Sequence, residues 1–181
     1  FFASKQKQTT AWHNKGTGIS CPTGQYDNGI GSCQYCRDNE IVISTTSCGV
    51  CEAGSIPNTE RLACIICPAG SMQVVMQPTC QDCPPGSVQP AQKMTFCSEC
   101  NQGYMSVSTT TCQPCSAGTY QPSKGQNFCA NCRSGEFQPD TMQISCYYCP
   151  AGTMQSKEGM GTCDPCPIGS VQTLQGKTAC D

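Results

Sequence analysis

The chain has 181 residues, a formal net charge of −2 and only 12% charged residues. Its ten Lys and Arg residues are scattered singly, which argues against a nucleic-acid or lipid-binding surface, and no apolar run approaches the roughly 18 residues of a membrane span. Leu, Ile, Val and Phe number only 23, too few for a large apolar core, whereas the 20 cysteines exceed the roughly 8–10% that marks a disulfide scaffold.

The cysteine content predicts both the compartment and the source of stability. Disulfides persist in oxidising surroundings, so we expect a secreted or cell-surface protein. A bridge that closes about 15 residues stabilises a fold by roughly 3 kcal/mol in the loop-entropy model, so ten bridges would contribute on the order of 30 kcal/mol. We therefore expect the fold to depend on oxidised cysteines and to be lost on reduction.

The first 20 residues contain no cysteine. Phe1, Phe2 and Trp12 are suited to packing, so we expect residues 1–20 to cap the array that follows or to end a preceding domain. His13 is the one histidine of the chain, and nucleophilic catalysis needs a base that a third group orients in a formed site. We therefore expect that the protein is not an enzyme.

From Cys21 to Cys180 the chain repeats one pattern. A C-x-x-C pair followed by 11 to 13 other residues occurs nine times, with a single cysteine before and after. Such self-similarity indicates a one-dimensional array in which each unit contacts its neighbours. The pattern stops at Asp181, one residue after its last cysteine, so we expect the rod of residues 21–181 to continue beyond that point.

Three columns recur when residues are counted from Cys21 and from the second cysteine of each pair. The third residue is Gly in nine of ten modules and Asn39 in the other, and the first is Pro in five, which predicts a type I turn with Pro second and Gly fourth. The fifth residue is always apolar and the sixth is Gln in six modules, the alternation of a short strand with its apolar face buried. We predict a small disulfide-rich fold, an elongated tandem array of about ten short β-hairpin-like modules with little regular secondary structure and no helix.

Two pairing schemes account for the cysteines to different extents. In a sequential scheme the second cysteine of each pair bonds the first of the next, and all twenty are used. In an interleaved scheme both cysteines of one pair bridge both of the next, which leaves one pair and two single cysteines over because nine is odd. Sequence alone does not prove connectivity. We expect the sequential scheme, with Cys21–Cys33, Cys36–Cys48, Cys51–Cys64, Cys67–Cys80, Cys83–Cys97, Cys100–Cys112, Cys115–Cys129, Cys132–Cys146, Cys149–Cys163 and Cys166–Cys180.

Metal binding and redox chemistry are the rival interpretations of C-x-x-C. Zinc sites with four cysteines need two pairs each, and nine pairs with two single cysteines do not divide in that way. A thioredoxin-type centre needs a helix N-terminus, and no helical stretch is predicted here. The carboxylates around Asp38-Asn39-Glu40 resemble a calcium ligand set but fit a solvated turn better. We expect no metal and no cofactor.

The motif Cys-x-x-Cys-Pro-x-Gly-[Ser/Thr], as in Cys146–Thr153 and Cys163–Ser170, resembles the ephrin-receptor-like cysteine-rich repeat, a relative of growth-factor-receptor and tumour-necrosis-factor-receptor modules. The resemblance extends over residues 21–181 and is strongest from Cys67 onward. Residues 36–39 lack both the Pro and the Gly, and Glu52 follows Cys51 in place of Pro. The resemblance implies an elongated extracellular stalk with disulfides between cysteines that are near in sequence.

The dipeptides between paired cysteines are the candidate contact residues. Ile65, Ile66, Tyr147 and Tyr148 place apolar bulk where other modules carry polar residues, and exposed apolar side chains on a weakly charged rod favour lateral contacts. We expect self-association or binding to other extracellular proteins. The hydroxyl runs 45–47 and 109–111 are candidate O-glycan sites.

These observations favour a structural function. We expect an extracellular repeat protein that forms a stiff stalk or a subunit of a surface fibre. The alternative is a cell-surface receptor or adhesin ectodomain whose rod binds a protein ligand. Structural arrays repeat uniformly, and only residues 33–51 depart clearly from the pattern, which favours the structural function.

Overall fold

The computed structural model describes residues 18–75 and 77–181, so most of the expected N-terminal cap, residues 1–17, lies outside the described part. The described residues form 18 short strands, paired two by two into nine antiparallel hairpins, and no helix. The predicted fold class is confirmed. The hairpins are β1 (Gln25–Asp27) with β2 (Cys33–Tyr35), β3 (Glu40–Ser44) with β4 (Ser47–Val50), β5 (Ser55–Pro57) with β6 (Cys64–Ile66), β7 (Ser71–Gln73) with β8 (Cys80–Asp82), β9 (Ser87–Val88) with β10 (Ser98–Glu99), β11 (Tyr104–Ser106) with β12 (Cys112–Pro114), β13 (Thr119–Tyr120) with β14 (Ala130–Asn131), β15 (Glu136–Phe137) with β16 (Tyr147–Tyr148) and β17 (Thr153–Met154) with β18 (Asp164–Pro165).

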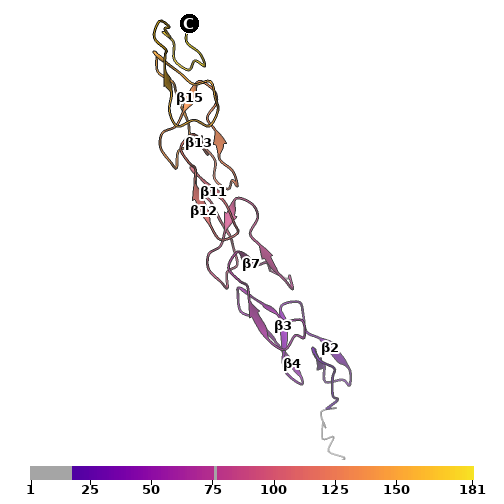
Figure 1. Ribbon diagram of the computed structural model, residues 1–181. Helices are drawn as coiled ribbons and strands as arrows, with labels where there is room; N and C mark the ends of the chain where they lie inside the picture. Colours follow the sequence, from indigo (N-terminus) through magenta and orange to yellow (C-terminus); the bar gives the residue numbers. More distant parts are fainter. Residues whose placement is uncertain (1–17, 76) are drawn as a thin grey trace, which may run out of the picture.

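The hairpins follow one another along a single long axis, from the N-terminal to the C-terminal end of the rod (Figure 1). We number the modules 1 to 10 by the ten disulfide loops in chain order, and call the two cysteines of each loop the opening and the closing cysteine. Module 1 is 21–33 and module 10 is 166–180; the intervening modules are 36–48, 51–64, 67–80, 83–97, 100–112, 115–129, 132–146 and 149–163.

Each module begins with a tight turn that starts one residue later than the sequence analysis predicts. In module 4 the N–H of Ser71 donates to the carbonyl of Pro68 at 3.2 Å, so Pro is the first residue of the turn and Gly70 is the third. Gly70 has a φ of +86°, and the matching glycines of eight other modules lie between +76° and +90°. A left-handed third residue is the requirement of a type II turn rather than the predicted type I. Asn39, at the matching position of module 2, is not left-handed.

In modules 1 to 9 the strand after the turn pairs with the dipeptide that follows the closing cysteine, and in module 10 Val171 and Asp181 exchange two backbone hydrogen bonds. In module 8 Glu136 lies opposite Tyr148 and Phe137 opposite Tyr147, and the rings of Phe137 and Tyr147 lie 6.0 Å apart. The C-x-x-C spacing therefore places the closing cysteine and two strand residues at the end of one module, and the opening cysteine of the next immediately after them.

The buried face of these strands is the reverse of the one we predict from sequence. The sixth-column glutamines are buried, with Gln138 and Gln155 each only 1% exposed, whereas the apolar residue before them is mostly half-buried. Only Ile56 and Val88 of the apolar column are buried, and Val171 is exposed. The buried interior of the described residues therefore consists mainly of opening half-cystines and glutamine side chains.

A hydrogen-bonded clasp explains why Gln is buried. In module 8 Nε2 of Gln138 donates to the carbonyl of Ser145 at 2.7 Å, and Oε1 accepts from the N–H of Asp140 at 3.1 Å. Both polar ends of the amide are thus paired inside the loop, which removes the cost of burying them. The same two bonds recur in modules 5, 7, 9 and 10, made by Gln89, Gln121, Gln155 and Gln172.

Loop length decides where this clasp forms. The five clasped modules are those whose bridged cysteines are 14 residues apart. Module 4 has a separation of 13, and its Gln73 bonds outward instead, accepting from the N–H of Gly54 at 2.7 Å and donating to Asn39 at 3.0 Å. Module 6 has a separation of 12 and carries Ser106, whose hydroxyl accepts the N–H of Gly86 at 2.8 Å.

Adjacent modules are joined by a repeated backbone ladder. The N–H of Gly118 in module 7 donates to the carbonyl of Gln138 in module 8 at 2.7 Å. In return the N–H of Cys132, which opens module 8, donates to the carbonyl of Gly118 at 2.9 Å. Module 8 is linked in the same way to module 9 through Gly135, Gln155 and Cys149. Turn, strand and next opening cysteine are therefore fixed relative to one another.

Each module also contacts the module two places along, so the expectation of contacts between nearest neighbours is incomplete. A β-carbon at Gly118 of module 7 would overlap the carbonyl of Gly159 in module 9, and one at Gly86 would overlap the carbonyl of Gly125. The N–H of Gly159 meanwhile donates to Cys132 of module 8 at 2.8 Å. The tenth residue of a loop thus contacts the two preceding modules. Glycine in the turn is required for this approach as well as for its positive φ.

Replacing Gly118 by Ala is expected to destabilise the rod by about 2–4 kcal/mol, because a left-handed Ala is strained and its methyl group displaces the backbone of module 9. Hydrogen exchange of modules 7 to 9 measures the effect. The control is Gly152→Ala, since Gly152 has a similar φ of +83° and open space around its β-position, so only about 1 kcal/mol of strain is expected. Equal losses in the two variants would contradict the close packing.

Candidate functional site: disulfide ladder and exposed dipeptides

The ten disulfides join the same cysteines as the sequential scheme. Their Cα–Cα distances lie between 5.5 and 5.8 Å, and the described residues include no free cysteine. From module 2 to module 9 the opening cysteine is buried, with Cys67, Cys115, Cys132 and Cys149 fully inaccessible. Each bridge of modules 2 to 9 therefore has one buried end and one end nearer the surface.

The bridge of module 3 is the most accessible at its closing end. Cys64 is exposed, whereas the other nine closing cysteines are half-buried. Module 3 also carries Pro57 in the Gln column and therefore has no clasp. Thiol–disulfide exchange depends on access of the attacking thiolate to a sulfur atom.

We expect Cys51–Cys64 to be reduced before the other nine bridges. Limited reduction, followed by alkylation of the freed thiols and peptide mapping, measures the order. Cys132–Cys146 is the internal reference, because its module is clasped by Gln138 and its opening cysteine is inaccessible. Release of Cys132–Cys146 at the same rate or sooner would contradict this expectation.

One cysteine cluster has the composition of a metal site. The sulfurs of Cys36 and Cys48 lie within 4.8 Å of a carboxylate oxygen of Glu40. Both sulfurs form the bridge of module 2, so neither is a thiolate, the form of cysteine that binds metals. Glu40 is already engaged, since its carboxylate accepts the N–H of Arg37 at 3.0 Å. The cluster therefore does not offer a ligand set in the oxidised protein.

The neighbouring acidic turn is occupied by an arginine. The guanidinium of Arg61, in module 3, donates to the carbonyls of Cys36 and Arg37 at 2.7 and 2.6 Å and lies 3.5 Å from the carboxylate of Asp38. A cation thus already lies against the turn that resembles a calcium site. The contact also joins module 3 to module 2, the module that lacks the turn glycine.

The four candidate contact residues are exposed on the hairpins. Ile65 and Ile66 are 52% and 51% exposed on β6, and Tyr147 and Tyr148 are 54% and 66% exposed on β16. The two dipeptides belong to modules 3 and 8 and therefore lie at separate places along the rod. Tyr148 also lies beside the module 10 loop, where a β-carbon at Gly176 would come 2.9 Å from its ring.

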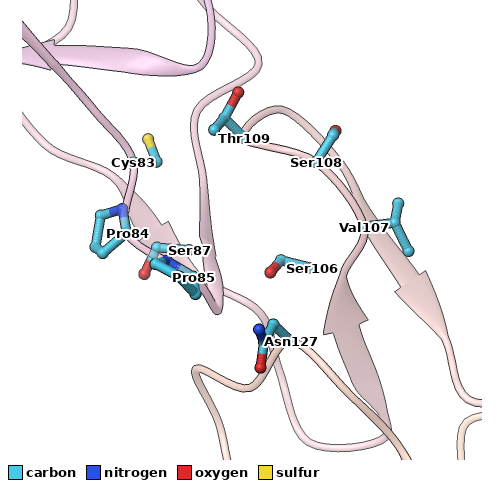
Figure 2. A pocket seen from close by; sticks show the side chains of 9 residues that line it. All are labelled: Cys83, Pro84, Pro85, Ser87, Ser106, Val107, Ser108, Thr109 and Asn127. Carbon is cyan, nitrogen blue, oxygen red and sulfur yellow. The ribbon is translucent and has the colours of Figure 1, made fainter.

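The short loop of module 6 leaves an open hollow of about 230 Å³ between modules 5, 6 and 7. Figure 2 shows its lining, which consists of two prolines, four small hydroxyl side chains, Cys83, Val107 and Asn127. No charged side chain lines it, and its one cysteine, Cys83, is bridged to Cys97. These residues include no titratable group that could act as a general acid or base.

The ion pair between Lys93 and Glu52 changes the acidity of the Glu52 carboxyl. Nζ of Lys93 in module 5 donates to Glu52 of module 3 at 2.6 Å, and this hydrogen bond and charge lower the pKa of the Glu52 carboxyl. A lowered folded-state pKa contributes stability above the ordinary Glu range, which is lost as the pH falls through the folded pKa. Both side chains are largely exposed, so screening weakens the contribution.

We expect Glu52→Gln to leave the urea midpoint at neutral pH unchanged within error. The small loss of stability that protonation of Glu52 causes at acidic pH should disappear in this variant. Equilibrium unfolding at neutral and acidic pH, at low and high salt, measures both effects. A large loss of stability at neutral pH would show that the pair matters more than an exposed contact should.

The comparison with known families agrees with this geometry. Residues 102–142 match the family model described as tyrosine-protein kinase ephrin type A/B receptor-like. The chain carries an ephrin-receptor-like cysteine-rich repeat. The matched stretch covers module 7 with parts of modules 6 and 8, and the other modules share its turn, hairpin and disulfide. No curated protein matches the chain significantly.

Ephrin-receptor-like repeats are non-catalytic modules of receptor ectodomains. Together with the ten disulfides, the repeat favours an extracellular location and is compatible with a receptor-like or structural role. Among residues 18–75 and 77–181, no helix is long and apolar enough to cross a membrane.

Two features of the array could not be recognised from the sequence. The first is the clasp, because Gln in a column of short strands reads as a solvent-facing residue. The second is the left-handed tenth residue of seven loops, occupied by glycine in four of them. The other three are Arg61, Lys93 and Met142, at φ of +56°, +61° and +62°. Because such different residue types occupy this position, the sequence shows no recognisable pattern there.

Proposed function

We propose that the chain is an extracellular structural rod, serving as a stiff stalk or as a subunit of a surface fibre. Residues 21–181 form the rod, and residues 1–20 cap it or end a preceding domain. The observation that supports this function best is that each module contacts both the next module and the one after it.

Contacts at two ranges make such a rod stiff. A chain of modules joined only by short linkers can bend at every junction. Here a bend between modules 7 and 8 would also separate Gly118 from the loop of module 9. Because close packing transmits strain, bending one junction disturbs the contacts of three modules.

The exposed dipeptides provide the lateral contacts of this proposal. Ile65, Ile66, Tyr147 and Tyr148 would bind a second rod or another extracellular protein, since a rod with so few charges has little electrostatic repulsion to overcome. Thr45, Thr46, Thr109 and Thr111 are exposed on loops, where O-glycans could be attached without disturbing a hairpin.

Electron microscopy and surface labelling test the proposal. Antibody against residues 21–181 should label the outside of unpermeabilised source cells, and native material should show thin stalks or fibres of constant width. Labelling only after permeabilisation would contradict the location. Isolated monomeric rods in native material would contradict the fibre form and leave the stalk to be tested by its attachment to the surface.

One observation favours the second candidate, a receptor or adhesin ectodomain. The irregular module 2 contributes a hollow of about 400 Å³ lined by Arg37, Asp38, Asn39, Glu40 and Val50, which joins charged and apolar groups. A photoreactive amino acid at position 50, used on source cells, distinguishes the two candidates. Crosslinking to one different polypeptide supports the receptor, whereas crosslinking only to other copies of this chain supports the fibre.

A further inference from the structure

We propose that the oxidised rod is a nearly inextensible tether, in which tension passes along a short covalent path that leaves out the module loops. The inference rests on the proposed stalk function, since a stalk is the setting in which its two ends are pulled apart. The path itself follows from which cysteines are joined.

The force-bearing path consists of disulfides and C-x-x-C segments alone. A pull on Cys21 reaches Cys33 through their bridge and then follows the backbone to Cys36, which is bridged to Cys48. The same alternation continues to Cys180. The 11 to 13 residues inside each loop, including the turn, the clasp and the left-handed tenth residue, carry no tension.

The length of this path is small. Ten bridges span 5.5–5.8 Å each between Cα atoms. Nine backbone segments of three residue steps add about 10–11 Å each, so the fully stretched oxidised path from Cys21 to Cys180 is about 150 Å. The reduced chain between the same residues would reach roughly 550 Å.

Little slack is stored in the path, because its backbone segments are already extended in the rod. β2, β6, β8 and β12 each begin at a closing cysteine and continue through the following dipeptide, so these steps have strand geometry before any force is applied. Tension can therefore straighten the zigzag of modules but cannot draw out their loops.

The limit depends on the sequential pairing. In the interleaved scheme, bridges such as Cys33–Cys48 and Cys36–Cys51 would leave every second loop in the path. The stretched oxidised length would then more than double. A pulling experiment therefore measures the pairing and the tether property together.

Single-molecule force spectroscopy on the chain, held by tags at its two ends, tests the inference. Without reductant, we expect the Cys21–Cys180 segment to stop lengthening at about 150 Å in total, after subtraction of the tags and terminal residues. Extension well beyond that value before any bond is reduced would overturn the proposal.

A small dithiol reductant provides the second arm. Each reduction transfers two electrons and two protons from the dithiol to one bridge, which yields two cysteine thiols and a cyclic disulfide of the reductant. Each event should add about 35–45 Å, with a final gain near 400 Å. Steps of other sizes would contradict the path.

The double variant Cys132→Ser with Cys146→Ser is the matched control. It should lengthen the oxidised path by about 40 Å without any reductant, and this holds even if module 8 fails to fold, because the stretched length depends only on covalent bonds. An unchanged length would overturn the proposal. The outcome is independent of surface labelling, so failure of the tether and failure of the stalk function are distinguishable.

Discussion

We expect reduction of the ten disulfides to unfold the chain without any denaturant. The buried hydrophobic residues of the described part are eight half-cystines with Ile56 and Val88, so little apolar burial remains once the bridges open. The bridges close 12 to 14 residues, each contributing roughly 3 kcal/mol in the loop-entropy model, and their combined loss far exceeds the 5–15 kcal/mol stability of an ordinary domain.

Hydrogen–deuterium exchange before and after reduction measures this effect. We expect the amides of Gly118, Cys132 and Gly135, which bond between modules, to be protected in the oxidised protein and to exchange at unfolded rates after reduction. The control is protein treated with alkylating reagent alone, which should incorporate no label and keep its protection. Protection that survives complete reduction would show that another interaction holds the fold.

Replacing Gln138 by Leu is expected to destabilise the rod by about 1–3 kcal/mol, because two backbone groups in part-buried hydrogen bonds lose their partners. Those groups are the carbonyl of Ser145 and the N–H of Asp140. Leu is apolar and close in size, so an ordinary core position would tolerate it. The urea midpoint of the oxidised protein and the exchange of residues 138–146 measure the result.

Gln113→Leu is the matched control for this substitution. Gln113 lies on β12 and is exposed, so the same chemical change should shift the midpoint by less than about 0.5 kcal/mol. If Gln138→Leu proved as mild as Gln113→Leu, or stabilising, the clasp would not contribute to stability and glutamine burial would need another explanation.

The covalent framework and the hairpins could be predicted from the sequence because they are set by spacing. Cysteines three residues apart fix where one module ends and the next begins. Ten apolar residues, eight of them followed by a polar one as Phe137 is by Gln138, predict short strands. Tyr147 and Tyr148 are exposed between the half-buried Cys146 and the buried Cys149.

The buried face could not be predicted in the same way. Alternating side chains show that a strand has two faces, but the alternation does not show which face is buried. An apolar residue normally decides the choice by burial of its surface. Here the module is too thin to bury both faces, and the nitrogen and the oxygen of the Gln138 amide each form a hydrogen bond within the loop. The amide therefore fills the interior, and Phe137 packs against Tyr147 at the surface.

Contacts between a module and the second module along could not be predicted because no local pattern reports them. The glycine column has a sufficient local explanation in its positive φ, which hides its second role in admitting a distant loop. The left-handed position that completes the contact is filled by Met142 in module 8 and by Gly159 in module 9. A column that accepts both residues has no visible periodicity.

Peptide mapping of the untreated protein under non-reducing conditions tests the disulfide ladder most directly. Proteolysis within the loops and between the cysteines of a pair should release ten disulfide-linked species, each joining an opening cysteine to the closing cysteine of the same module, such as Cys132 to Cys146. Alkylation should detect no free thiol. A fragment that links Cys33 to Cys48, or several free thiols in a protein with intact shape, would contradict the account.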